Sequence, residues 1–309
     1  MGTLRKVLNI VTTLHSAGAI SFVEQGPLKV SWAHVGVPHS TGYDSAVILH
    51  LAATAGRLSQ SSHGNMRRAT PFLGSDVTLR RCVQLPPGLL DATPSRRCIE
   101  HACELLSRWP EAHIQARLLL RHVHPARFAV ADLEGAPGNQ TSMCGSSLKQ
   151  LGVLWTTTEC PISLVENIVH EMAHQKLAIL GVDIHHATRL VKNPAALCLS
   201  PVILDRLRPI SAVLHAQYSF LHVAELDIRM LQQATIGAEQ ARIASKLSLN
   251  IRRVALGQAT LRLHCKTDRA GRTFLNVLSQ WADSISQRGH ALLRLADFRI
   301  GRRCEYPIQ

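Results

Sequence analysis

The sequence predicts a mainly α-helical protein with a few short β-strands, and three observations support this fold class. Leu, Ala, Ile and Arg are abundant, whereas aromatic residues make up 4% of the 309 residues, a composition that favours helices over a β-sandwich. Apolar residues recur at helical spacing over long stretches, while β-branched runs are few and short. A chain of this length buries a substantial core, so we expect one large domain, with residues 1–110 as an alternative N-terminal subdomain.

The first part of the chain contains three expected helices and one long loop. Residues 44–60 have helical apolar spacing, whereas residues 61–78 are rich in Ser, Gly, Asn and Thr, which indicates a loop. Two further helices are expected at 95–108 and 111–122. They are separated at Pro110, because a proline ring interrupts helical hydrogen bonding.

The middle of the chain indicates a strand, a loop and a second strand. Residues 126–134 are expected to form a short strand, and residues 151–158 have the β-branched and aromatic enrichment of strands. Between them, residues 135–147 are rich in Gly, Ser and Asn and form the clearest loop in the sequence.

The helix expected at 161–180 is the most strongly indicated element. Pro161 suits a first helical turn, because its missing N–H is not needed there. Ser163 and Glu166 have the spacing of a capping box. Gly181 is expected to end the helix.

The C-terminal part predicts three long helices after a loop. The loop runs through Pro194 and Pro201, and a long helical pattern then follows Pro209 to about residue 234. Two further helical patterns cover 238–265 and 272–287.

Charge, cysteine content and hydropathy limit the class of protein. The net charge of +13 comes from dispersed Arg residues without a long basic run, which suggests an acidic partner and not a nucleic acid. No apolar stretch is long enough for a transmembrane helix, so no membrane partner is expected. Eight cysteines without a C-x-x-C pair indicate reduced thiols, and residues 1–15 are too polar for a signal peptide. We therefore expect a cytoplasmic protein.

A metal site is predicted by His170 and His174, which lie four residues apart on the helix expected at 161–180. This spacing puts both rings on one helix face, where they can share an ion. Imidazole suits zinc, iron, copper or nickel. Glu171 is placed to reach a metal-bound water or a substrate. The alternative is a pair of surface or core histidines, but the apolar flanks and the strand–loop–helix context favour the metal site.

The next long helix is the expected source of a third ligand. Residues three and four apart line one stripe of it: His215, Tyr218, His222 and Glu225. Several polar groups on an otherwise apolar helix are costly unless they are paired or liganded. We expect this helix to pack antiparallel to the helix at 161–180, with His215 as third ligand and His222, then Glu225, as alternatives. Residues 115–236 would then form the metal-site core.

Arg208 lies just before this second helix. A guanidinium beside a metal site can bind a carboxylate through two parallel hydrogen bonds. Arg208 is therefore the expected carboxylate anchor, with an ordinary surface Arg as the alternative.

Four segments within residues 115–230 together resemble the HExxH-motif proteins of ribosomal peptide natural-product clusters. In chain order they are LLLRHVHP at 118–125, LGVLW at 151–155, VHEMAHQKL at 169–177 and RPISAVLHAQYSF at 208–220.

Members of that family are 2-oxoglutarate-dependent, iron(II) peptide β-hydroxylases that act on ribosomally made precursor peptides. The resemblance implies Fe(II) at His170 and His174, with His215 at the matching third position. It implies Arg208 as the anchor of 2-oxoglutarate and Glu171 as a residue that orients a ligand or a water. This chain departs from the pattern in having Ser, Pro and aliphatic residues at 200–204, where an aromatic-rich stretch is usual. His222 also leaves the third ligand open.

Two other functions fit the same motif. In a zinc-dependent metallopeptidase, Glu171 would be the general base and zinc would activate its water. A non-catalytic peptide-binding protein with a vestigial site is the second alternative. Arg208 distinguishes the two enzymes, because a peptidase does not need a 2-oxoglutarate anchor.

Overall fold

The computed structural model describes residues 30–38, 43–54, 70–72, 77–79, 85–129, 142–146, 151–182, 184, 190–193, 197–200 and 207–304. The elements are mainly helices with a few short strands, as the sequence predicts. The chain divides into two compact units, unit 1 at Met1–Leu180 and unit 2 at Gly181–Gln309. This boundary falls within residues 115–236, the expected metal-site core.

Unit 1 contains a mixed sheet of six short strands in its described residues. The strands are β1 (Thr70–Phe72), β2 (Val77–Leu79), β3 (Leu89–Asp91), β4 (His122–Phe128), β5 (Cys144–Ser146) and β6 (Val153–Thr157). Their order is β1-β2-β4-β6-β5, with β3 paired to β4 outside this path. β4 is parallel to both β2 and β6, whereas β5 runs antiparallel to β6.

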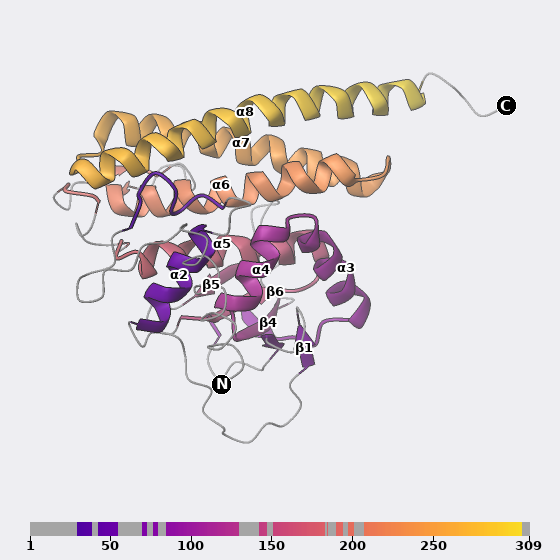
Figure 1. The fold of residues 1–309 in the computed structure, drawn as a ribbon. Helices are drawn as coiled ribbons and strands as arrows, with labels where there is room; N and C mark the ends of the chain where they lie inside the picture. Colours follow the sequence, from indigo (N-terminus) through magenta and orange to yellow (C-terminus); the bar gives the residue numbers. More distant parts are fainter. Residues whose placement is uncertain are drawn as a thin grey trace. The chain divides into compact units, whose positions relative to one another are not determined.

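Four helices complete the described part of unit 1: α2 (Tyr43–Thr54), α3 (Arg96–Ser107), α4 (Pro110–Leu119) and α5 (Pro161–Ile179). α5 packs against β5 and β6 and contacts α2, α3 and α4 (Figure 1). Nearly all of its side chains are buried, which explains why apolar residues occur on every side of this helix.

The ends of α5 differ in part from the prediction. Pro161 occupies the first turn and Gly181 follows the helix with φ of 82°, as expected for a C-terminal glycine. The predicted capping box is wrong. Cys160 is the N-cap, no side chain caps the helix, and the Ser163 hydroxyl is buried inside it. Because Pro161 starts the helix early, Ser163 lies in the first turn and not at its border.

The described residues of unit 2 form a short two-stranded ribbon and three long helices. The ribbon pairs β7 (Leu197–Leu199) with β8 (Leu207–Pro209), which leads directly into α6 (Ile210–Gln233). α7 (Ala238–His264) and α8 (Arg269–Cys304) follow. The three helices contact one another and lie side by side (Figure 1).

Five other predicted elements need correction. β1 lies within residues 61–78, which were expected to be a loop, and β2 begins there at Val77. Neither strand was expected, because three residues are too few to show a period. The helix expected at 111–122 ends at Leu119, and β4 begins at His122, four residues before the expected strand at 126–134. β5 lies in the loop expected at 135–147. α8 extends far beyond the expected range of 272–287.

Of the described helices, none has a stretch long and apolar enough to span a membrane. Six described cysteines are free thiols: Cys98, Cys103, Cys144, Cys160, Cys198 and Cys265. The N-terminal stretch considered for a signal peptide lies outside the described residues.

Candidate metal centre

His170 and His174 face each other on α5. Their Nε2 atoms lie 3.0 Å apart, and the ring planes meet at 74° with centroids 4.7 Å apart. Both side chains are half-buried on a helix whose other residues are almost all buried. The two nitrogens therefore point toward each other on a face of α5 that is partly accessible to solvent. One neutral ring can also donate a hydrogen bond to the other across the same distance.

Glu171 is held by strand β5 through two side chains. Its Oε2 accepts a hydrogen bond of 2.6 Å from the hydroxyl of Ser146. The pKa of the Cys144 thiol is raised well above its usual value, chiefly by burial and then by the charge of Glu171 and a hydrogen bond to it. The thiol therefore remains protonated, and Glu171 acts as an acceptor for two donors of β5.

Glu171 belongs to a polar stripe that ties α5 to the sheet. Four residues before it, Asn167 donates to the Thr156 hydroxyl at 2.9 Å. Four residues after it, Gln175 accepts from the Gly152 amide at 2.8 Å and donates to the carbonyl of Val153 at 3.1 Å. Residues four apart share a helix face, so the stripe fixes the rotation of α5 relative to β5 and β6.

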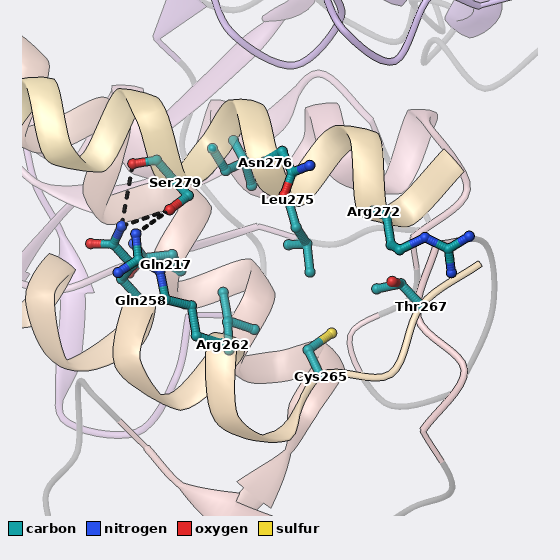
Figure 2. A pocket seen from close by; sticks show the side chains of 11 residues that line it. Gln217, Gln258, Arg262, Cys265, Thr267, Arg272, Leu275, Asn276 and Ser279 are labelled. Atoms are coloured by element: carbon teal, nitrogen blue, oxygen red, sulfur yellow. Dashed lines mark hydrogen bonds between the residues drawn. The ribbon is translucent and has the colours of Figure 1, made fainter. Parts of the chain in front are cut away.

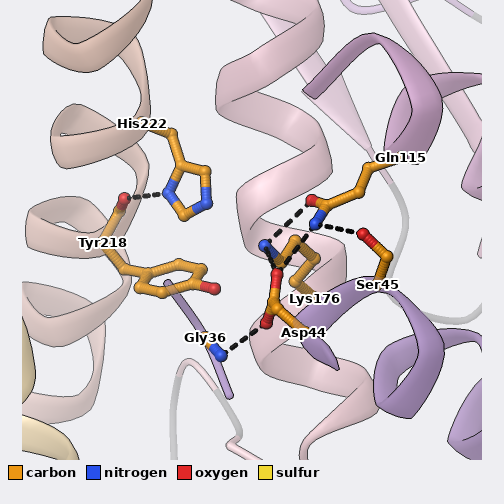
Figure 3. A network of polar contacts seen from close by, with 7 residues as sticks. All are labelled: Gly36, Asp44, Ser45, Gln115, Lys176, Tyr218 and His222. Carbon is orange, nitrogen blue, oxygen red and sulfur yellow. Dashed lines mark hydrogen bonds and ion pairs between the residues drawn. The ribbon is translucent and has the colours of Figure 1, made fainter. Parts of the chain in front are cut away.

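A buried charged network anchors α5 to α2 and α4. Lys176 is fully buried, and its Nζ lies 2.6 Å from Oδ2 of Asp44 and 3.0 Å from Oε1 of Gln115 (Figure 3). Gln115 also donates to Oδ2 of Asp44 at 2.8 Å and to the Ser45 hydroxyl at 2.9 Å. The amide of Gly36 donates to the other Asp44 oxygen. The network closes around the carboxylate and fixes the helix just after His174.

In unit 2, His215 and His222 are both fully buried on α6. Nε2 of His215 lies 3.0 Å from the carbonyl oxygen of Val182, and Nδ1 of His222 lies 2.8 Å from that of Tyr218 (Figure 3). A carbonyl only accepts, so each of these nitrogens carries the proton. The lone pair then lies on Nδ1 of His215 and on Nε2 of His222. Metal-binding histidines typically donate their other N–H to such a carbonyl.

Glu225 is committed to other partners. Its carboxylate pairs with Arg288 and, at 2.9 Å, with Arg229, and it accepts from the indole of Trp281 at 3.3 Å. Burial alone would raise the pKa of this carboxyl, but the two guanidinium groups outweigh it and lower the pKa. Glu225 is therefore a weaker candidate ligand than either histidine.

Arg208 lies on β8, where it is paired with Cys198 of β7, and its side chain is half-buried. It precedes α6 by two residues but belongs to the ribbon and not to the helix. Its guanidinium has no hydrogen-bond or ion-pair partner among the described residues of unit 2.

His170, His174 and Glu171 belong to unit 1, whereas His215, His222, Glu225 and Arg208 belong to unit 2. Within the described ranges, no three or more His, Cys, Asp or Glu side chains form a group that could hold an ion. Ser146, Cys144 and the buried pair Lys176–Asp44 were not predicted from the sequence. The four-residue spacing of Asn167, Glu171 and Gln175 was a visible signal for the polar stripe.

Comparison with models of known protein families and with curated proteins gives no match for this chain.

Proposed function

We propose that this chain is an iron(II)- and 2-oxoglutarate-dependent oxygenase that hydroxylates the β-carbon of side chains in a ribosomally made precursor peptide. The observation that carries the proposal is the facing pair of His170 and His174, whose Nε2 atoms lie 3.0 Å apart. The sequence resemblance is the reason for proposing this reaction, and the geometry of the two histidines supports the binding of a metal ion.

The two nitrogens are close enough for one ion to bind both rings, and imidazole suits iron, zinc, copper or nickel. Two histidines and a carboxylate with open positions are typical of non-haem iron oxygenases, whereas His215 or His222 as third ligand would give three histidines, a set that catalytic zinc also uses. The choice of iron therefore rests on the sequence resemblance.

When bound, Fe(II) supplies the activation of O₂: 2-oxoglutarate loses CO₂ and becomes succinate with one oxygen atom, while the other oxygen atom enters a C–H bond as hydroxyl. The residues of this chain hold and orient the components. His170 and His174 supply two ligands, and His215 or His222 would supply a third from a ring nitrogen whose partner nitrogen is fixed by a carbonyl. Arg208 would bind the distal carboxylate of 2-oxoglutarate.

Glu171 acts as a positioning residue in this proposal. Its Oε2 accepts from Ser146, so the carboxylate is directed toward β5 while His170, one residue before it, presents its ring about 100° around the helix. The buried acceptor fixes β5 beside α5 without serving as a ligand.

The test is metal analysis of protein purified without oxygen, followed by succinate release from 2-oxoglutarate with added Fe(II). We expect about one iron per chain and iron-dependent succinate release. His170→Ala and His174→Ala should lose both the bound iron and the succinate release, because the remaining ligands would hold the ion with one bond fewer and without a preformed geometry. His290→Ala is the matched control, since His290 is an exposed histidine of α8 bonded to Ser286. Full iron occupancy in His170→Ala would show that the pair is not a ligand set.

A zinc peptidase is the second candidate, because Glu171 is a nearly buried carboxylate directly adjacent to His170. Glu171→Gln separates the two enzymes. A peptidase would lose its general base and about 10²–10⁴-fold in hydrolysis. The oxygenase would keep its iron and a measurable part of its succinate release. Peptide hydrolysis with zinc and no response to 2-oxoglutarate would rule out the oxygenase, and the absence of any bound metal would favour the non-catalytic peptide-binding protein.

A further inference from the structure

Unit 2 contains a polar pocket between α6, α7 and α8 that the proposed metal centre does not use. Its volume is about 270 Å³, and it is lined mainly by polar side chains from the last turns of α7 and the first turns of α8 (Figure 2). Pockets that enclose whole drug-sized ligands measure about 300–1,000 Å³. The occupant of this pocket is therefore short.

Two guanidinium groups give the pocket a positive charge, and only one of them has hydrogen-bond and ion-pair partners among the described residues. Arg262 donates to the Ser279 hydroxyl and lies 3.3 Å from the Asp283 carboxylate. Arg272 is exposed at the other end of the pocket and has no hydrogen-bond or ion-pair partner in the described part of the chain (Figure 2). The nearby Asp268 is engaged by the Gly271 amide at 2.7 Å. Arg272 is thus the cation available to an anion.

Amide side chains line the rest of the wall. Gln217 is 2% exposed, and its Oε1 is buried without a hydrogen-bond partner. Asn276 is exposed on α8 and has no hydrogen-bond partner within the described residues. A primary amide offers both donors and an acceptor, which is the pairing pattern of a peptide group. An unpaired buried amide is costly, so a ligand that pairs with it gains affinity.

Apolar contacts complete the pocket. Leu261 and Leu278 are buried beside it, and Leu275 projects between its two ends (Figure 2). The wall therefore combines one available cation, unpaired amides and an aliphatic patch. The Cys265 thiol also lines the pocket, but burial raises its pKa to about 11, so it remains a neutral thiol.

We propose that this pocket binds the carboxyl-terminal residue or two of a peptide, with the carboxylate on Arg272, the last peptide groups on the amides of Gln217 and Asn276, and an aliphatic side chain against the leucines. Small inorganic anions would use the guanidinium alone. An uncharged peptide end would use the amides alone. Binding to this pocket needs no metal and is independent of the chemistry proposed for His170 and His174.

The test measures fluorescence anisotropy of a fluorescein-labelled Gly-Gly-Ala-Leu peptide in the presence of a chelator. The free carboxylate form should bind about tenfold or more tightly than the same peptide with a C-terminal amide, as expected for one charge-assisted hydrogen-bonded contact. Arg272→Gln should abolish this preference. Arg294→Gln is the matched control, because Arg294 is an exposed arginine of the same helix outside the pocket.

A second variant tests the peptide assignment itself. Asn276→Ala should weaken both forms of the peptide by the same factor and leave the preference for the carboxylate intact. Both substituted residues are exposed, so circular dichroism should show unchanged folding. Equal binding of the two peptide forms, or a preference that survives Arg272→Gln, would overturn the proposal. If phosphate or acetate displaces the peptide and Asn276→Ala binds it like wild type, the pocket recognises anions only and the peptide assignment is wrong.

Discussion

Replacing Lys176 by Met should destabilise unit 1 strongly, because it leaves the Asp44 carboxylate buried without its counter-charge. Lys176 and Asp44 have side-chain exposures of 0% and 1%. Burial lowers the pKa of Lys176 despite the opposing effect of Asp44, which indicates that the pair gains little over water. Breaking such a pair from one side is nevertheless costly, at about 3–5 kcal/mol. Asp44 keeps its bonds from Gly36 and Gln115, so we expect a loss near 3 kcal/mol.

Urea unfolding followed by far-UV circular dichroism measures this loss. A domain has about 5–15 kcal/mol of stability in total, so a loss of this size shifts the midpoint clearly. The double variant Lys176→Met/Asp44→Asn should recover most of the loss, because it removes both charges. Lys192→Met is the control: its pair with Asp268 spans 3.9 Å between exposed side chains, and such pairs contribute about 0–1 kcal/mol. A cost below about 1 kcal/mol for Lys176→Met would refute the reasoning.

Three further substitutions have defined outcomes. The pKa of Glu225 is lowered in the folded state. Its contribution to stability is therefore fully present above its ordinary pKa of about 4.5 and is lost as the pH falls through the lowered pKa. Glu225→Gln should cost about 1–3 kcal/mol at neutral pH and flatten the acid limb of the stability profile in urea unfolding measured as a function of pH. Gly257→Ala should lower the melting temperature, because its Cβ would meet Gln217 Oε1 at 2.2 Å, at a cost of about 1–3 kcal/mol; in a Gln217→Ala background the same change should be neutral or stabilising. Arg208→Lys should weaken 2-oxoglutarate binding by about 1.5–3 kcal/mol in calorimetry while iron content stays constant, and unchanged affinity would refute the anchor assignment.

The long helices were predictable from the sequence because their apolar spacing extends over many turns. α5, α6 and α7 each match the predicted range within two residues at either end. The strands β1 and β2 were not predictable, because three residues cannot establish a period of two. The pairing of β1 with β2 and of β2 with β4 depends on tertiary contacts that no local sequence pattern indicates.

Recognition of the candidate site from the sequence was partial for a similar reason. The pair His170 and His174 is local, so the helical period alone brings the rings together. Ser146 is 25 residues from Glu171 and lies in a segment expected to be a loop, so its hydrogen bond to Glu171 depends on the sheet. Lys176 and Asp44 are separated by 132 residues, and no sequence spacing indicates that they pair.

The arrangement of α5 explains how one helix can both support a sheet and present the face that we propose binds a metal ion. Asn167, Glu171 and Gln175 all hydrogen-bond to β5, β6 or the segments that flank them, and this fixes the helix rotation at three levels. His170 and His174 each precede a member of that stripe by one residue, so their rings point about 100° away from the sheet. Because the rotation is fixed by bonds on the neighbouring face, the two nitrogens are held together before any ion binds. Such preorganisation would reduce the ordering cost of binding an ion.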